Sequence, residues 1–408
     1  MAPPAPYIVD EILEEIFIRL PTPAALARAS TASPRFRRII TERPFLRRIR
    51  ALHPPPLLGF AVDKRAFHHA QEPHPSAPLA RALADGADFS YSFVPVPQPQ
   101  PNQELLSPWY HRDIRDGRVL LGRRFGKDDP SPVFRELVVC DPLHRRYVLL
   151  PPFPDDLAHW VEHQVYNPFK PFLLPVAEEE TEETAFRIIW MAHCRTKLAA
   201  FVFSSSTGKW QEATKSGPTG LVLDRGDSAI LSRIHPHFLM RHYAYGCFYW
   251  DWLVTGSRKL LMLDTRRMEF SFADLPPGEW SKRVAIVEAG EGRPGIFGFH
   301  GEIASDLSYA IAQNTGESPN QWQMLKTISL DPGYIYSIDA ATGRYLLLVR
   351  TVASSLGNLV ENSLVEYFSM DAKMLQLQRV CTKQCSLMYN GTHIYADFPP
   401  SLLSSRAI

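Results

Sequence analysis

The sequence predicts a mainly β protein with a small α-helical domain at its N-terminus, and the β part fits an irregular, kelch-like β-propeller. Three observations support this fold class. Residues 8–52 carry apolar side chains at helical spacing, and residues 109–400 form a succession of short apolar runs separated by turns. Prolines are also unevenly distributed, because residues 1–175 contain 27 of the 36. This change in composition predicts a change in architecture along the chain.

The predicted helical domain covers residues 7–52 and follows a disordered stretch over 1–6. Apolar side chains recur every three or four residues from Ile8 to Leu20, and acidic residues occupy the first turns, where they suit the positive end of the helix dipole. Pro21 ends this first helix, because the residue before a proline is disfavoured in the α conformation.

Two further helices in this domain begin with the same device. Thr22-Pro23 and Ser33-Pro34 each place an N-cap residue before a proline that can occupy the first helical position. A last short helix is expected from Phe45 onward. Three or four helices of this length bury little apolar surface, so we expect the domain to need a partner or a neighbouring domain for stability.

Residues 53–108 are predicted to be a proline-rich linker with possible first β elements. Pro54-Pro55-Pro56 ends the helical domain, and one short helix fits Leu79–Leu83. Proline stands at every second position near residues 95–101, which favours an extended polyproline conformation because proline cannot donate to a strand ladder.

Residues 109–400 are predicted to form the β domain, followed by a tail over 401–408. Five units of apolar strand, polar turn and second strand recur, with turns centred near 143, 206, 266, 341 and 371. Their spacing is irregular, whereas propeller blades run about 40–50 residues, so we expect some blades to be enlarged or undetected. A closed ring protects strand edges that an open sheet would expose. A large β-sandwich is the alternative.

Composition argues against several classes of function. Lys plus Arg number 44 and Asp plus Glu 43, so the net charge of +1 provides no global attraction to nucleic acid or to a membrane. No apolar run approaches the length of a transmembrane helix, and the N-terminus lacks the pattern of a signal peptide. Five cysteines in 408 residues suggest a reducing compartment. We therefore expect a location in the cytoplasm or nucleus.

Motifs that could carry chemistry are weak. Gly290–Gly295 matches the dinucleotide-binding spacing, but Pro294 and the apolar residues after it predict a hairpin loop rather than the start of a helix. Cys381 and Cys385 lack the further ligands that structural zinc needs, and neither cysteine nor acid completes a site for His235, His237 and His242. We expect no metal and no cofactor.

No nucleophile elbow, phosphate-binding loop or zinc-protease motif appears, so no catalytic residue is assigned and the chain is expected not to be an enzyme. A propeller enzyme remains a distant alternative, since paired carboxylates leave no spacing signature. Eight arginines lie between Arg28 and Arg50, with Glu42 as the acid among them. No nucleic-acid recognition motif accompanies them, which favours a solvated face or a contact with an acidic partner.

The helical domain resembles an F-box. The resemblance lies in the Ile8–Leu20 stripe with its Leu-Pro step, in Leu26, in Ser33–Ile40 and in Pro44–Leu46. In that family a later helix carries an aromatic residue flanked by arginines, and Phe36 occupies that position here. The resemblance implies that the domain binds a Skp-type adaptor through the residues Ile8, Ile12, Leu13, Ile16, Leu20, Pro21, Leu26, Phe36 and Ile39. These side chains also present more apolar surface than four short helices can cover.

Residues 138–152, with the sequence VVCDPLHRRYVLLPP, resemble the first repeat of the β domains associated with F-boxes in plants, particularly in the large grass families. The resemblance implies a substrate-recognition subunit of an SCF-type ubiquitin ligase. The adaptor would connect it to cullin and RING subunits, and the β domain would bind a protein target through residues that the sequence does not identify. A ligase-independent interaction scaffold is the alternative.

Overall fold

The computed structural model divides the chain into two units, Met1–Pro56 (unit 1) and Leu57–Ile408 (unit 2). It describes residues 8–20, 23–52, 55–62, 67–95, 109–123, 136–158, 170–175, 185–193, 198–213, 240–254, 257–300, 305–313, 322–352, 364–384 and 391–396. Among the helices in these ranges, none is long and apolar enough to cross a bilayer.

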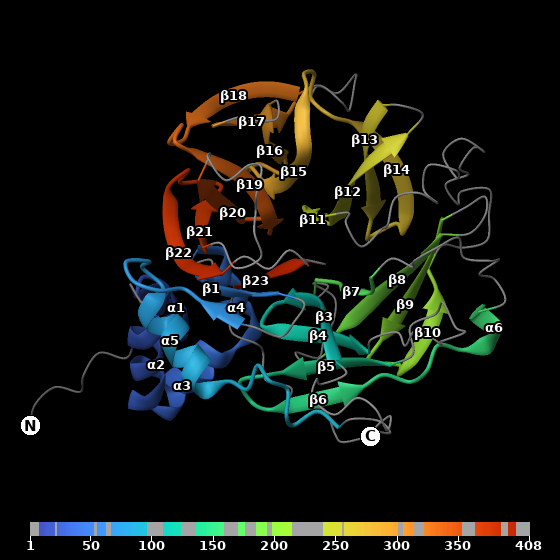
Figure 1. Ribbon diagram of the computed structural model, residues 1–408. Helices are drawn as coiled ribbons and strands as arrows, with labels where there is room; N and C mark the ends of the chain where they lie inside the picture. Colours follow the sequence, from blue (N-terminus) through green and yellow to red (C-terminus); the bar gives the residue numbers. More distant parts are fainter. Residues whose placement is uncertain are drawn as a thin grey trace, which may run out of the picture. The chain divides into compact units, whose positions relative to one another are not determined.

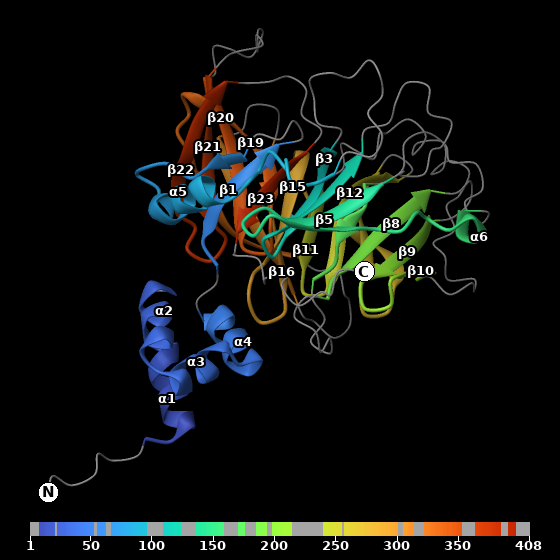
Figure 2. The same ribbon diagram turned by 90° about the horizontal axis from the view of Figure 1, so that it is seen from below.

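Unit 1 contains helices where the sequence predicts them (Figure 2). They are α1 (Asp10–Ile18), α2 (Pro23–Ala32), α3 (Pro34–Thr41) and α4 (Arg43–Leu52). The predicted N-cap of α3 is confirmed, because Ser33 Oγ accepts a hydrogen bond from Arg35 N at 3.2 Å with Pro34 in the first turn. One apolar core joins α1, α3 and α4 and consists of Leu13, Phe17, Ile18, Ile39, Ile40 and Phe45.

The described part of unit 2 contains six antiparallel sheets. Five have four strands, and in each the order runs from the innermost strand outward: β3 (Trp109–Arg115), β4 (Arg118–Arg123), β5 (Leu137–Asp141), β6 (Arg146–Leu149); β7 (Phe172–Leu173), β8 (Arg187–His193), β9 (Leu198–Ser204), β10 (Lys209–Glu212); β11 (Arg241–Ala244), β12 (Cys247–Val254), β13 (Ser257–Asp264), β14 (Glu269–Asp274); β15 (Trp280–Glu288), β16 (Pro294–His300), β17 (Asp306–Ala312), β18 (Trp322–Ser329); and β19 (Tyr334–Ala341), β20 (Tyr345–Val352), β21 (Leu364–Asp371), β22 (Leu377–Gln384). The sixth sheet has the order β23 (Thr392–Ala396), β1 (Leu57–Val62), β2 (Phe67–His69).

These sheets surround a common axis as the blades of a six-bladed β-propeller (Figure 1). The first strand of each blade lies innermost, and innermost strands of neighbouring blades contact one another. The propeller prediction is therefore confirmed, and the sandwich alternative is wrong.

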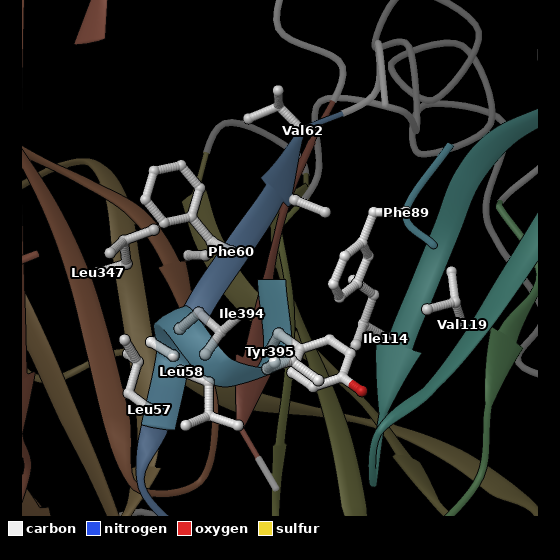
Figure 3. Close-up of a cluster of buried hydrophobic side chains, with 14 of the residues drawn as sticks. Leu57, Leu58, Phe60, Val62, Phe89, Ile114, Val119, Leu347, Ile394 and Tyr395 are labelled. Carbon is white, nitrogen blue, oxygen red and sulfur yellow. The ribbon is translucent and has the colours of Figure 1, made fainter. Parts of the chain in front are cut away.

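Strands from the two ends of unit 2 close the ring. β23, the last strand, pairs with β1 in antiparallel register, with Phe60 opposite Ile394. Every residue of β1 is buried, because blades or helix α5 (Ala77–Gly86) cover it on each side. Figure 3 shows Phe60, Ile394 and Leu347 converging at this closure.

This closure corrects the predicted domain boundary. Residues 53–108 were expected to form a linker, but unit 2 begins at Leu57, and β1, β2 and α5 belong to the propeller. The possible β elements are thus real strands, and the short helix expected near Leu79–Leu83 lies within α5. Most of the proline-alternating segment, residues 96–101, lies outside the described residues.

The repeat read from the sequence is mostly one structural feature. The turns near 143, 206, 266 and 371 join the third and fourth strands of four different blades, whereas the turn near 341 joins the first and second strands of the last four-stranded blade. The equivalent turn between β17 and β18 lies outside the described residues.

An aspartate often begins this turn because its carboxylate can cap the turn's backbone N–H groups. Asp141 Oδ1 accepts from Leu143 N at 3.0 Å, and Asp264 Oδ1 accepts from Arg266 N at 2.8 Å. The same geometry recurs at Asp371.

Candidate functional site

One face of α1 exposes three isoleucines, which we call the isoleucine stripe. Ile8, Ile12 and Ile16 have 42%, 53% and 45% of their surface exposed. They are four residues apart, so they follow one side of the α1 helical path. The opposite side carries Leu13 and Phe17, each only 5% exposed, into the core of unit 1. The helix is therefore apolar on two faces, and within unit 1 only one of them is covered.

Ion pairs hold α1 against α3 and fix which face points outward. The two carboxylate oxygens of Asp10 lie 2.6 Å from Arg35 Nη2 and from Arg38 Nη2. Arg35 Nη2 also donates to Ile8 O at 2.6 Å. The hydrogen bond from Arg35, followed by the charges of both arginines, lowers the pKa of Asp10, which keeps its carboxylate ionised near neutral pH.

A second set of ion pairs joins α1 to α4. Arg48 Nη2 lies 2.5 Å from Glu15 Oε1, and Arg48 Nη1 lies 3.5 Å from Glu14 Oε2. The hydrogen bond from Arg48 lowers the pKa of Glu15. Charged side chains consequently border the isoleucine stripe, an arrangement typical of protein-binding surfaces.

The structure separates the nine residues that the F-box resemblance singles out. Ile8, Ile12 and Ile16 are exposed; Leu13 and Ile39 are buried in the core of unit 1; Leu20, Leu26 and Phe36 are partly buried against that core; and Pro21 lies outside the described residues. Leu13 and Ile39 are thus not available at the surface, because they face inward on α1 and α3. Phe36 packs edge-on against Phe17, with ring centroids 5.1 Å apart.

Sequence reasoning missed Val9, which is 43% exposed beside Ile8. It stands outside the helical period because it is the N-cap residue of α1, in extended conformation. The extended start of the helix therefore widens the apolar surface by one side chain.

A second group of polar side chains lies near the axis of unit 2. We call Arg112, Asp113, Lys170, Arg241 and His393 the axial cluster. Asp113 on β3 is buried; its Oδ2 accepts from Leu173 N on β7 at 2.9 Å, and its carboxylate pairs with Arg241 on β11. His393 Nδ1 on β23 lies 3.8 Å from Asp113 Oδ1.

The shortness of β7 explains this convergence. Because β7 consists only of Phe172 and Leu173, polar groups of β3 and β11 meet across it. The Arg241 guanidinium lies over the Phe172 ring at 4.4 Å, a favourable cation–π geometry. Sequence patterns did not indicate this cluster, since its members come from distant strands.

Burial and nearby positive charges control protonation in the axial cluster. Burial, followed by the charges of Lys170, Arg241, His111 and Arg112, lowers the pKa of His393 well below its ordinary value. The nearby Asp113 carboxylate would raise that pKa, but the cations and burial outweigh it. The imidazole of His393 is therefore neutral at physiological pH.

The weaker motifs behave mostly as expected. The Gly290–Gly295 segment spans the turn between β15 and β16, so the hairpin prediction is confirmed. His242 is buried on β11, and burial lowers its pKa to about 4. Cys381 is a buried free thiol, whereas Cys385, His235 and His237 lie outside the described residues. Within the described ranges, no three His, Cys, Asp or Glu side chains gather as a metal site requires.

Comparison with known proteins gives similarity of fold only. No family model and no curated protein matches the sequence. A putative TolB from Agrobacterium tumefaciens is 10% identical, with 70% of this chain and 87% of that chain covered and a TM-score of 0.35. The fucose-specific lectin from Aleuria aurantia is 9% identical, with coverages of 66% and 74% and a TM-score of 0.35.

The WD40 domain of SCAP from fission yeast is 10% identical, with coverages of 69% and 75% and a TM-score of 0.29. Similarities at this level carry no argument about function. The six-bladed assignment rests instead on the strand order and on the closure of β1 with β23.

Proposed function

We propose that this protein is the substrate-recognition subunit of an SCF-type E3 ubiquitin ligase, related to plant F-box proteins with a C-terminal β domain. Unit 1 docks a Skp-type adaptor, which connects the chain to cullin and RING subunits. The propeller binds a protein target. The chain itself is not an enzyme; it raises the local concentration of target lysines near the transfer machinery, in the cytoplasm or nucleus.

The isoleucine stripe is the observation that carries this proposal. Three exposed β-branched side chains on one helix are suited to insertion into a groove formed by partner helices. Burying each isoleucine contributes roughly 1.5–3 kcal/mol, before the cost of association is subtracted. Because α1 is already held by ion pairs to α3 and α4, little ordering of unit 1 is needed when the partner binds.

The division into two units supports separate roles. The apolar stripe belongs to unit 1, whereas the propeller, in unit 2, has its own core and closes its own ring. A ligase-independent scaffold would use the propeller in the same way but would not need the stripe. Binding of the adaptor therefore distinguishes the two functions.

Co-purification of the full chain with a Skp-type adaptor tests the proposal. We expect the wild type to form a stoichiometric complex and the Ile12→Glu, Ile16→Glu variant to lose it, because two charges then occupy the apolar contact. Both positions are exposed, so the substitutions should leave the helices folded, which far-UV circular dichroism can verify.

The matched control is Leu149→Glu, which places the same charge on an apolar side chain of unit 2 that is 46% exposed on β6. This variant should bind the adaptor like the wild type. Failure of the wild type to bind, or equal binding by the double variant, would overturn the ligase proposal and favour the scaffold.

A further inference from the structure

We infer that the axial cluster of the propeller binds an oxyanion, a carboxylate or phosphate group presented by a small ligand. The inference concerns unit 2 alone and does not depend on adaptor docking. It rests on the convergence of Arg112, Lys170, Arg241 and His393 around the Asp113 carboxylate.

The charges within this cluster are unequal. Arg112, Lys170 and Arg241 carry three positive charges, whereas Asp113 supplies one negative charge. The Asp113 carboxylate already pairs with Arg241 and accepts from Leu173 N at 2.9 Å. Gathering like charges at a partly buried place is costly unless an anion compensates them. Guanidinium and ammonium groups are also the side chains best suited to carboxylate and phosphate.

Solvent reaches the cluster. The side chains of Arg241 and His393 are 14% and 13% exposed, and Arg112 and Lys170 are half-buried rather than enclosed. A small ion can therefore approach these groups, while partial burial keeps its interaction with them stronger than at an open surface.

His393 provides a further hydrogen-bonding position. Its Nε2 is buried and has no hydrogen-bond partner among the described residues. Its Nδ1 lies 3.8 Å from Asp113 Oδ1, beyond hydrogen-bond reach, so the neutral ring can carry its single proton on Nε2. A buried N–H without an acceptor is unfavourable, and a small shift of the ring toward an oxyanion would satisfy it.

Thermal unfolding of the full chain, followed by tryptophan fluorescence, tests the inference. Sodium phosphate and sodium succinate are titrated separately, each replacing sodium chloride at constant ionic strength and pH 7.5. We expect a saturable rise in the unfolding temperature, because a ligand that binds only the folded state stabilises it. A rise with phosphate alone identifies phosphate as the ligand group, a rise with succinate alone identifies carboxylate, and a rise with both indicates general oxyanion binding.

Charge variants give opposite expected results. Lys170→Gln removes one cation and should weaken the apparent affinity about tenfold. Asp113→Asn removes the competing carboxylate while retaining an oxygen acceptor for Leu173 N, and should strengthen the affinity. The control Lys209→Gln removes an exposed positive charge on β10 and should leave the affinity unchanged.

Two results would overturn the inference. One is the absence of a saturable rise with either salt in the wild type. The other is equal affinity in the wild type and Lys170→Gln, which would place the binding elsewhere on the chain. Since Lys170 is half-buried near the start of β7, its substitution keeps the test informative even if Asp113→Asn fails to fold.

Discussion

The substitution Phe60→Ala tests whether β1 closes the propeller. Phe60 is fully buried and stacks on Tyr367 of β21, with ring centroids 4.5 Å apart. Through β1 it thus joins the closing blade to the blade of β19–β22 (Figure 3). Truncating a buried phenylalanine to alanine costs roughly 3–5 kcal/mol. The stacked pair accounts for about 0.5–1.5 kcal/mol of that loss.

Urea unfolding monitored by tryptophan fluorescence measures this loss selectively. All eight tryptophans lie in unit 2, so the signal does not report on unit 1. The control is Leu149→Ala on β6, where an exposed side chain should change the free energy of unfolding by less than about 0.5 kcal/mol. Equal losses in the two variants would refute the reasoning, because β1 would then contribute nothing to closure.

Two further predictions concern unit 1 and acid stability. Phe45→Ala removes a fully buried side chain from the core of unit 1 and should lower the helical circular dichroism signal while the tryptophan fluorescence of unit 2 stays unchanged; a coupled loss of both would contradict the division into two units. Burial, as the largest cause, lowers the pKa of His68 and of His242 from 6.5 to about 4, so between these pH values the unfolded chain binds more protons and the free energy of unfolding falls as the pH drops. Urea unfolding at pH 7, 6 and 5 should show this fall, by at most about 1.4 kcal/mol per pH unit for each histidine, and His68→Gln should make it shallower; an unchanged slope would show that His68 is not held neutral.

Much of the local structure could be predicted because its causes lie within a few residues. Ser33-Pro34 predicts the start of α3 through a cap and a proline, and the Asp264 turn predicts a hairpin through a carboxylate that reaches two or three residues ahead. The helical period of α1 likewise needs no partner to be recognised. The period alone, however, did not say that Leu13 faces the core while Ile12 faces outward.

The blade count could not be read reliably from the same patterns. The turn near 341 looks like the others in sequence, since an apolar strand precedes and follows it, yet it joins the first two strands of its blade. Local turn chemistry does not record the position of a strand within a blade. Pairing between strands, which depends on contacts across the sheet, supplies that information.

The sequence by itself determined the mainly β class, the helices of unit 1 and the capped turns, because propensity, periodicity and capping act over short stretches of chain. Tertiary structure alone decided that β1 pairs with β23, that the isoleucine stripe stays uncovered within unit 1, and that Asp113 meets Arg241 and His393. These features join residues from distant strands, or depend on which helix face finds a neighbour. Such relations leave no spacing in the sequence, since they arise only when the strands assemble around the axis and the helices pack.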